Sequence, residues 1–331
     1  MKKMLLLFYL TACCTLLSVS SWAAGQPAPQ VVVSIKPLHS LISGVMQGVG
    51  EPQLLVKGGG SPHSYVLRPS EARALARADL IIWVGHQLES FLEKPLATLG
   101  RQARQMELSK SLQPYLLPMR KGGSWERHTH RHKKAEHPGE PEGHHEDHAA
   151  HPAMNEHGEK NPHLWLDPLL AIRIVDLATA AISEIDPAHR TRYADNSTQL
   201  KMRLTKLHAE LQTKLAPVRD IPYIVFHDAY QYFETAFGLH AVGSLTIDPE
   251  RKPGARRILE IRQKIKQLNA RCVFSEPQFE PRLVATVIEG SNAKTGILDP
   301  LGADLPNGPN SYFTLLNRLA KNLIEGLRQS P

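Results

Sequence analysis

The sequence predicts an α/β protein of two lobes similar in design, joined by helices, with a cleft between them. Short apolar runs alternate with amphipathic segments in both halves of the chain, a pattern typical of parallel sheets covered by helices. Two long helical segments follow one another in the middle, with no strand between them. Three histidines occupy similar loop positions after apolar runs or before a helix. Ligands of open parallel sheets collect beyond the carboxyl ends of strands, so we expect the site there.

Residues 1–23 have the features of a secretory signal peptide. Lys2 and Lys3 precede an apolar run, and small residues follow at Ser21-Trp22-Ala23-Ala24. The run is too short for a lasting membrane span. Leu10-Thr11-Ala12-Cys13 is similar to a lipoprotein cleavage box, but the apolar core before it would be very short. We therefore expect export without lipidation.

Cysteine use and charge limit the function classes. Cys13 and Cys14 lie in the signal, which leaves Cys272 alone in the exported chain and excludes an intramolecular disulfide. The formal net charge is +7. The basic residues are scattered and alternate with acids, without interleaved aromatics, so we predict a solvated surface and no nucleic-acid partner. Roughly 300 exported residues suggest two domains of ordinary size.

The predicted N-terminal lobe, residues 24–166, begins with alternating strands and helices. Three glycines after the second strand, Gly58-Gly59-Gly60, permit positive φ and hold His63 over the sheet edge. A phosphate-binding loop is disfavoured, because neither GxxxxGK[ST] nor GxGxxG is present. Ser70 is a predicted N-cap. Strands are predicted at 31–35, 53–56 and 80–84, and helices at 38–49, 71–78 and 88–99.

A histidine-rich insert interrupts this lobe at 122–160. It contains nine histidines mixed with acids, prolines and glycines. This composition cannot bury a core, so we predict a disordered tract. Imidazoles and carboxylates suit borderline divalent metals such as zinc, and we interpret the tract as metal-collecting rather than as an insert without a role.

The segment Asn161–Pro168 marks the return to regular structure. Asp167 followed by Pro168 reads as an N-cap and first helical residue. His163 lies just ahead of an apparent strand at 164–166. The helix that follows has a predicted core stripe, and a second helix is predicted at 188–216, so residues 167–216 connect the lobes. The stripe consists of Leu169, Ile172, Val175, Ala178, Ile182 and Ile185.

The C-terminal lobe, residues 217–331, repeats the strand–helix alternation. Its first strand ends at His227-Asp228, its third ends at Glu276, and its fourth ends at Asp299. His63 and His163 are therefore expected on one side of the cleft, and His227 and Asp299 on the other. Strands are predicted at 223–226, 239–247, 271–275 and 295–298, and helices at 229–237, 255–269, 281–291 and 312–327.

Seven motifs, taken in order, resemble the periplasmic zinc-binding proteins of ABC uptake systems, the ZnuA type within the cluster A-I metal-binding proteins. The likeness covers essentially the whole mature chain and includes the charged histidine insert of the zinc branch. The motifs are IKPLHS at Ile35–Ser40, GGGSPHSYVLRPS at Gly58–Ser70, ADLIIWVG at Ala78–Gly85, HLWLDP at His163–Pro168, VFHDAYQYF at Val225–Phe233, FSEPQF at Phe274–Phe279 and LDPLG at Leu298–Gly302.

This resemblance implies parallel four-stranded sheets and a long backbone helix starting at Asp167. It also implies that His63, His163 and His227 bind Zn²⁺, with Asp299 or water as the fourth ligand. Some relatives have an acidic residue where this chain has Pro62. Many pair the cysteine equivalent to Cys272 with one near the C-terminus; here that partner is missing. The implied partner is an inner-membrane ABC permease, and we expect a periplasmic monomer without enzyme activity.

The ligand chemistry favours zinc independently, because three imidazoles and one oxygen suit a tetrahedral Zn²⁺ site. Such a site should lose zinc on acidification through about pH 6.5. Asp228 and Glu276 are candidates to orient imidazoles, or else helix caps or surface acids. Two alternatives stay open: a secreted zinc hydrolase, and a manganese or iron carrier of the same fold, which would be expected to use more carboxylates.

Overall fold

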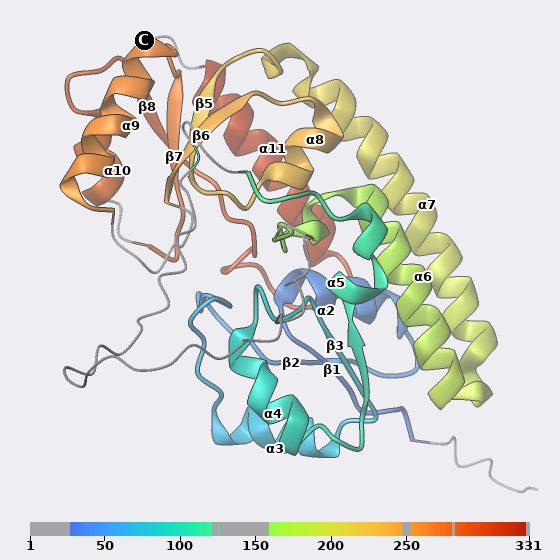
Figure 1. The fold of residues 1–331 in the computed structure, drawn as a ribbon. Helices are drawn as coiled ribbons and strands as arrows, with labels where there is room; N and C mark the ends of the chain where they lie inside the picture. The colour runs from blue at the N-terminus through green and yellow to red at the C-terminus, as the bar shows by residue number, and fades with distance from the viewer. Residues whose placement is uncertain (1–26, 121–124, 126–158, 247–252, 280–281, 329–331) are drawn as a thin grey trace, which may run out of the picture.

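The computed structural model describes residues 27–120, 125, 159–246, 253–279 and 282–328. The predicted signal peptide and nearly all of the histidine-rich tract lie outside these residues. Two lobes, each with a parallel four-stranded sheet, lie one above the other in Figure 1, with two long helices along one side of both. The predicted two-lobed α/β fold with four-stranded sheets is confirmed. The predicted domain boundaries at 166 and 216 stay predictions.

The N-terminal sheet has the strand order β2-β1-β3-β4. Its apolar strands form as predicted, but the fourth strand was missed because its residues are mostly polar. Only Met106 of that strand is buried, as expected for an edge strand with one covered face. The strands are β1 (Val31–Val33), β2 (Gln53–Leu54), β3 (Leu80–Trp83) and β4 (Arg104–Glu107), and the helices are α2 (Lys36–Val45), α3 (Pro69–Arg77), α4 (Glu93–Thr98) and α5 (Leu108–Ser111).

All three predicted helix starts in this lobe differ from the structure, and α2 begins at Lys36 rather than at residue 38. Helix α3 begins at Pro69, so its N-cap is Arg68 rather than Ser70. Glu71 stabilises this start, because its Oε2 accepts a hydrogen bond from the Arg68 backbone N–H at 2.8 Å. The helix predicted at 88–99 consists of a short 3₁₀ turn, Ser90–Leu92, followed by α4.

Helices α6 (Pro168–Ile185) and α7 (Arg190–Leu215) connect the lobes. The Asp167 Oδ1 caps α6 as predicted, accepting from the Leu169 N–H at 2.8 Å. Leu164–Leu166 is a 3₁₀ helix and not a strand. Leu169 is 45% exposed and not in the core. Since α6 contacts both α7 and α2, its buried face is wider than the predicted stripe and includes Leu170, Ala171, Ile174 and Ala181.

The C-terminal sheet has the order β6-β5-β7-β8, all parallel. All four strands occur where the sequence predicts them, with shifts of one or two residues at their ends. They are β5 (Tyr223–His227), β6 (Ala241–Thr246), β7 (Cys272–Ser275) and β8 (Lys294–Ile297), and the helices are α8 (Gln231–Phe237), α9 (Ala255–Gln267), α10 (Arg282–Ile288) and α11 (Ser311–Arg328).

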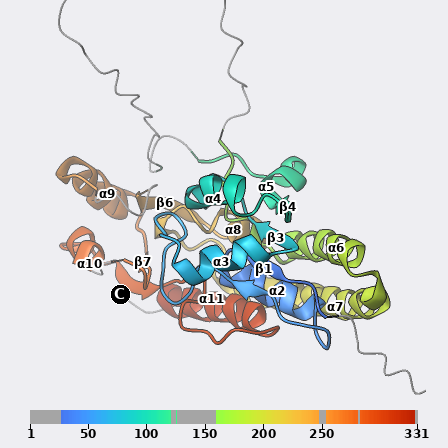
Figure 2. The ribbon, with the colours of Figure 1, turned by 90° about the horizontal axis from the view of Figure 1, so that it is seen from below.

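The last helix crosses back onto the N-terminal lobe. Helix α11 contacts α2 and α7, and Figure 2 shows α2 and α11 side by side. The Tyr312 N–H donates to Ser40 Oγ at 2.9 Å, and its hydroxyl donates to the Trp165 carbonyl at 2.7 Å. Lys36 Nζ donates to the Ala303 carbonyl at 2.7 Å. These buried bonds fix the two lobes relative to each other.

One hydrophobic core runs through both lobes. It contains residues of the first sheet, such as Val33, of the connecting helices, such as Leu204, and of the second sheet, such as Phe274. Cys272 is fully buried and free, as its isolation in the sequence predicts, and burial raises the pKa of its thiol to about 12. No helix in the described part of the chain is long and apolar enough to cross a membrane.

Candidate metal centre

Each of the three candidate histidines is positioned by a different element. His63 lies in the loop after β2, His163 directly precedes the 3₁₀ turn before α6, and His227 is the last residue of β5. The His63 loop is held on its far side by Tyr65, whose hydroxyl donates to Glu71 Oε1 at 2.8 Å. The site therefore combines a loop, a helix approach and a strand end, all at the interface of the lobes.

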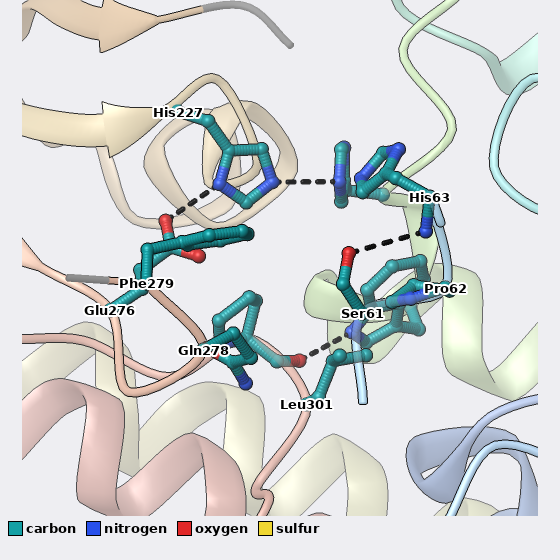
Figure 3. Close-up of a pocket in the computed structure, with 11 residues that line it drawn as sticks. Ser61, Pro62, His63, His227, Glu276, Gln278, Phe279 and Leu301 are labelled. Atoms are coloured by element: carbon teal, nitrogen blue, oxygen red, sulfur yellow. Dashed lines mark hydrogen bonds and ion pairs between the residues drawn. The ribbon is translucent and has the colours of Figure 1, made fainter. Parts of the chain in front are cut away.

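The structure brings these three side chains together. Their potential ligand atoms all lie within 4.8 Å of one another. The ring centroids are 5.5 Å apart for His63 and His163, 5.6 Å for His63 and His227, and 5.0 Å for His163 and His227. Figure 3 shows His63 and His227 on opposite sides of one pocket, with their rings directed into it. Among the described residues, this is the group of histidines and acids that could hold a metal ion.

Two of the imidazoles are oriented by side-chain acceptors. The Nδ1–H of His163 donates to Asn161 Oδ1 at 2.8 Å, and the Nδ1–H of His227 donates to Glu276 Oε1 at 2.7 Å. A neutral imidazole with a protonated Nδ1 has its lone pair on Nε2. Both rings therefore present Nε2 to the centre, in the way that metal-binding histidines are generally fixed. Glu276 is thus the orienting residue that the sequence suggested.

Burial favours the neutral form of His63 and His163. Desolvation, followed by the charge of His227, lowers the pKa of His63 to about 3. The pKa of His163 is also lowered, first by burial and then by the charges of His227 and His63. The Nε2 atoms of His163 and His227 are only 3.2 Å apart. Two neutral imidazoles would point lone pairs at each other there, and a cation bound by both nitrogens removes that repulsion.

Asp299, the fourth predicted ligand, does not join this group. Its Oδ1 accepts from Gln278 Nε2 at 2.8 Å and from the Leu301 N–H at 3.0 Å, and its Oδ2 accepts from the Ala303 N–H at 2.6 Å. The carboxylate therefore holds the loop that begins at Asp299. The carboxylate of the other candidate, Asp228, pairs with Arg120, whose Nε lies 3.0 Å from Asp228 Oδ2.

The space next to the histidines is small and largely apolar. The cavity volume is about 10 Å³, which is roughly the size needed for one water molecule. Phe279 stacks on Phe226, with centroids 4.8 Å apart, and covers the His227 side. The space between the histidines is therefore about large enough for one small species such as a metal ion. The rest of the lining consists of Ser61, Pro62, Trp165, Glu276, Gln278, Pro300 and Leu301.

Three residues that support the site were missed at the level of sequence. Asn161 orients His163, Gln278 binds Asp299, and Arg120 binds Asp228 and Glu234. Asn161 lies two residues before a candidate ligand, and that proximity is a usable signal. Arg120 lies 108 residues from Asp228, and no local pattern predicts such a pairing.

The family assignment follows from comparison with known proteins. The model of the family described as "Zinc-uptake complex component A periplasmic" matches residues 31–326. The chain belongs to this family. It is a family of zinc-binding components of transport systems, and not a family of enzymes.

Relatives and solved structures agree with the assignment. The chain is 47% identical over 305 residues to the high-affinity zinc uptake system protein ZnuA of Brucella abortus (strain 2308), covering 90% of this chain and 91% of the relative. It is 37% identical over 302 residues to the protein of that name from Yersinia pestis, with the same coverage. The periplasmic zinc binding protein TroA of Treponema pallidum superimposes with a TM-score of 0.72 at 18% identity, covering 91% of this chain and 100% of that one, which shows the shared fold.

Proposed function

We propose that this protein captures Zn²⁺ in the periplasm and delivers it to an inner-membrane ABC permease for high-affinity import. The zinc ligands in this proposal are His63, His163 and His227. The observation that carries it is the cluster of three buried imidazoles whose ligand atoms lie within 4.8 Å of one another. Family membership and the zinc-uptake relatives support the transport role.

The ligand set favours zinc over manganese, and the spacing of two ligand nitrogens is compatible with zinc. Zn–N bonds of about 2.0–2.1 Å at tetrahedral angles place ligand nitrogens roughly 3.3 Å apart, close to the 3.2 Å between the His163 and His227 Nε2 atoms. Manganese sites use more carboxylates. Both nearby carboxylates already accept other bonds, Glu276 from His227 and Asp299 from Gln278 and two backbone amides.

The cavity favours a carrier over a hydrolase. A catalytic zinc site needs room for a substrate and a carboxylate base beside the open position. Here the cavity between the histidines has a volume of only about 10 Å³. Glu276, the acid that lines it, already accepts the Nδ1–H of His227.

Metal titration tests this proposal. Apo protein competes with a chelator of known affinity for Zn²⁺ and Mn²⁺, and we expect one tight zinc per histidine cluster and much weaker manganese binding. A preference for Mn²⁺ would replace the zinc assignment. Turnover of ester or peptide substrates at catalytic protein concentration would point to the hydrolase instead. Growth of a strain lacking its own periplasmic zinc-binding protein, under zinc limitation, tests delivery to the permease.

A further inference from the structure

Arg120 links the two lobes beside the metal centre. The chain leaves the N-terminal lobe after α5 and reaches α8 of the C-terminal lobe (Figure 1), where the Leu117 N–H donates to the Tyr232 hydroxyl at 3.0 Å. Three residues further on, the Arg120 guanidinium pairs with Asp228, which directly follows His227 in the chain. The segment therefore joins the N-terminal lobe to the strand end that carries one of the three clustered histidines.

The guanidinium bonds two buried carboxylates at once. Its Nε donates to Asp228 Oδ2 at 3.0 Å, its Nη2 donates to Asp228 Oδ1, and its Nη1 donates to Glu234 Oε2 at 2.6 Å. Both carboxylate side chains are only 5% exposed. The Trp125 ring covers one face of the guanidinium, with its centroid 3.5 Å from Cζ. A planar fork that bonds one carboxylate through two nitrogens fixes direction as well as distance, which an ammonium group does not.

The residue that Arg120 holds is also tied to a second histidine of the cluster. The Asp228 carbonyl accepts a hydrogen bond from Asn161 Nδ2 at 2.9 Å, and Asn161 Oδ1 accepts the Nδ1–H of His163 at 2.8 Å. Asp228 is thus covalently next to His227 and one hydrogen-bonded side chain away from His163. A change in the position of Asp228 should therefore change how these two imidazoles lie relative to each other.

Stability alone is a weak reason for such a network. The cost of removing three charged groups from water offsets most of what their attraction contributes, so buried ion pairs often add little to folding free energy. What the network does supply is a fixed position at the lobe interface. His163 and His227 approach the centre from different lobes, and their Nε2 atoms lie 3.2 Å apart. Contacts that hold the lobes together at this point also hold that spacing.

We propose that Arg120 is a positioning residue that fixes the strand end carrying His227 relative to His163 across the lobe interface, and thereby slows zinc release. The proposal rests on the proposed function, since it takes these histidines as zinc ligands. Arg120 acts through Asp228 and leaves the set of ligands as it is. Without this pair the imidazoles are less preorganised, so the bound state loses part of its advantage over the free state.

The test compares two full-length proteins in which the network has the same net charge. The triple variant Arg120→Met/Asp228→Asn/Glu234→Gln removes all three charges, and uncharged side chains of similar size in place of a buried ion network often keep or raise stability. Glu234→Gln alone retains the Arg120–Asp228 pair and is the reference. Arg120→Lys keeps the charge without the fork. Arg104→Met/Glu184→Gln, which removes an exposed ion pair at the amino end of β4, is the control.

Three quantities are measured: zinc affinity by chelator competition, the rate of zinc release by chelator capture, and the melting temperature of the apo protein. We expect the triple variant to bind zinc about 3- to 10-fold more weakly than Glu234→Gln and to release it faster, with an apo melting temperature that is equal or higher. This loss is smaller than the roughly 10- to 100-fold typical of residues that contact a metal ligand directly. Arg120→Lys should release zinc faster than wild type, and the control should release it at the wild-type rate.

Equal affinity and release rate in the triple variant and in Glu234→Gln would overturn the proposal, and so would an equal loss in the Arg104→Met/Glu184→Gln control. A purely structural role would lower the apo melting temperature and leave the release rate of the folded protein unchanged. If the triple variant does not fold, Arg120→Lys against wild type decides: an unchanged release rate then overturns the proposal. Failure of the proposed function looks different, because wild-type protein itself would then bind no tight zinc.

Discussion

The Nε2 atoms of His163 and His227 lie 3.2 Å apart, although the residues are 64 positions apart in the chain. Each ring is held from behind, by Asn161 and by Glu276 respectively. This pair is preorganised, because little further movement is needed for both nitrogens to bind one ion. Preorganisation reduces the entropy lost on binding and so raises affinity.

Replacing any one histidine of the cluster should therefore weaken zinc binding by orders of magnitude. We expect His63→Ala, His163→Ala and His227→Ala each to lose the tight site in a competition titration, because two imidazoles cannot complete the sphere. Asp299→Asn should cost much less. His240→Ala, an exposed histidine in the C-terminal lobe, is the control and should bind like wild type. Unchanged affinity in any variant of the three would remove that residue from the site.

The affinity should depend on pH less steeply than the number of histidines suggests. Every ligand that must lose a proton on binding adds one unit to the slope of log K against pH. Burial lowers the pKa of His63 to about 3 and lowers that of His163. His63 is then already neutral at pH 5, and His163 gives up its proton more readily than an ordinary histidine, whose pKa is about 6.5. The loss of affinity on acidification through pH 6.5 should therefore involve fewer than all three imidazoles.

Zinc titrations between pH 5 and pH 7.5 measure this slope directly. A slope below three is expected in this range. A slope of three would mean that the folded apo site binds a proton at His63, against its lowered pKa. His63→Ala should leave the slope unchanged while lowering the affinity.

The sequence predicts the strands that carry ligands better than the contacts that support them. Val225 and Val273 lie in apolar runs that end at His227 and near Glu276. The apolar runs predict the strands, and ligands of parallel sheets lie beyond the carboxyl ends of strands, so the sequence locates His227 and Glu276. The sequence did not predict strand β4, because an edge strand such as Arg104–Glu107 can be polar on its exposed face and then has no apolar run. Leu169 was misassigned because the direction of a helix's buried face depends on which neighbours pack against it.

The fourth coordination position shows the limit of sequence reasoning most clearly. The sequence leaves that position open between Asp299 and water, since Asp299 follows a strand and carries a carboxylate. Its two oxygens instead accept bonds from Gln278, Leu301 and Ala303. Two of those bonds come from backbone N–H groups, and no residue type signals which amides a loop will aim at a carboxylate.

The packing around the free cysteine gives a stability prediction. A Cβ on Gly326 of α11 would lie 2.8 Å from ring carbons of Phe274 and 3.0 Å from Cys272 Sγ. Gly326→Ala should therefore destabilise the protein by about 1–3 kcal/mol, because overpacking of a fully buried site outweighs the gain in helix propensity. Chemical denaturation measures the change. Lys321→Ala, on the exposed face of the same helix, should stay within about 0.5 kcal/mol of wild type; equal effects would mean that α11 shifts to accept the methyl group.

The histidine-rich tract can be removed without touching the metal centre, because its stem is closed by described contacts. The Met119 N–H donates to the Glu159 carbonyl at 2.9 Å, and Lys160, predicted inside the tract, forms an antiparallel bridge with Pro118. Arg120 stacks on Trp125, with its Cζ 3.5 Å from the ring centroid. Replacing residues 126–158 with a short Gly-Ser linker keeps all of these groups.

We expect this deletion to retain the fold and one tight zinc per chain, and to lose the additional weaker zinc. The composition of the tract predicts disorder, so zinc held there should have to order the chain that binds it, at a cost of about 1–2 kcal/mol per backbone residue. Its sites should therefore be weaker than the preorganised cluster. Weak binding close to the cleft still raises the local zinc concentration, and zinc uptake should suffer mainly when zinc is scarce. A matched variant in which the nine histidines are replaced by serine separates metal binding from tract length. If either protein lost the tight site, histidines of the tract would be primary ligands, and His63, His163 and His227 would not form a complete site by themselves.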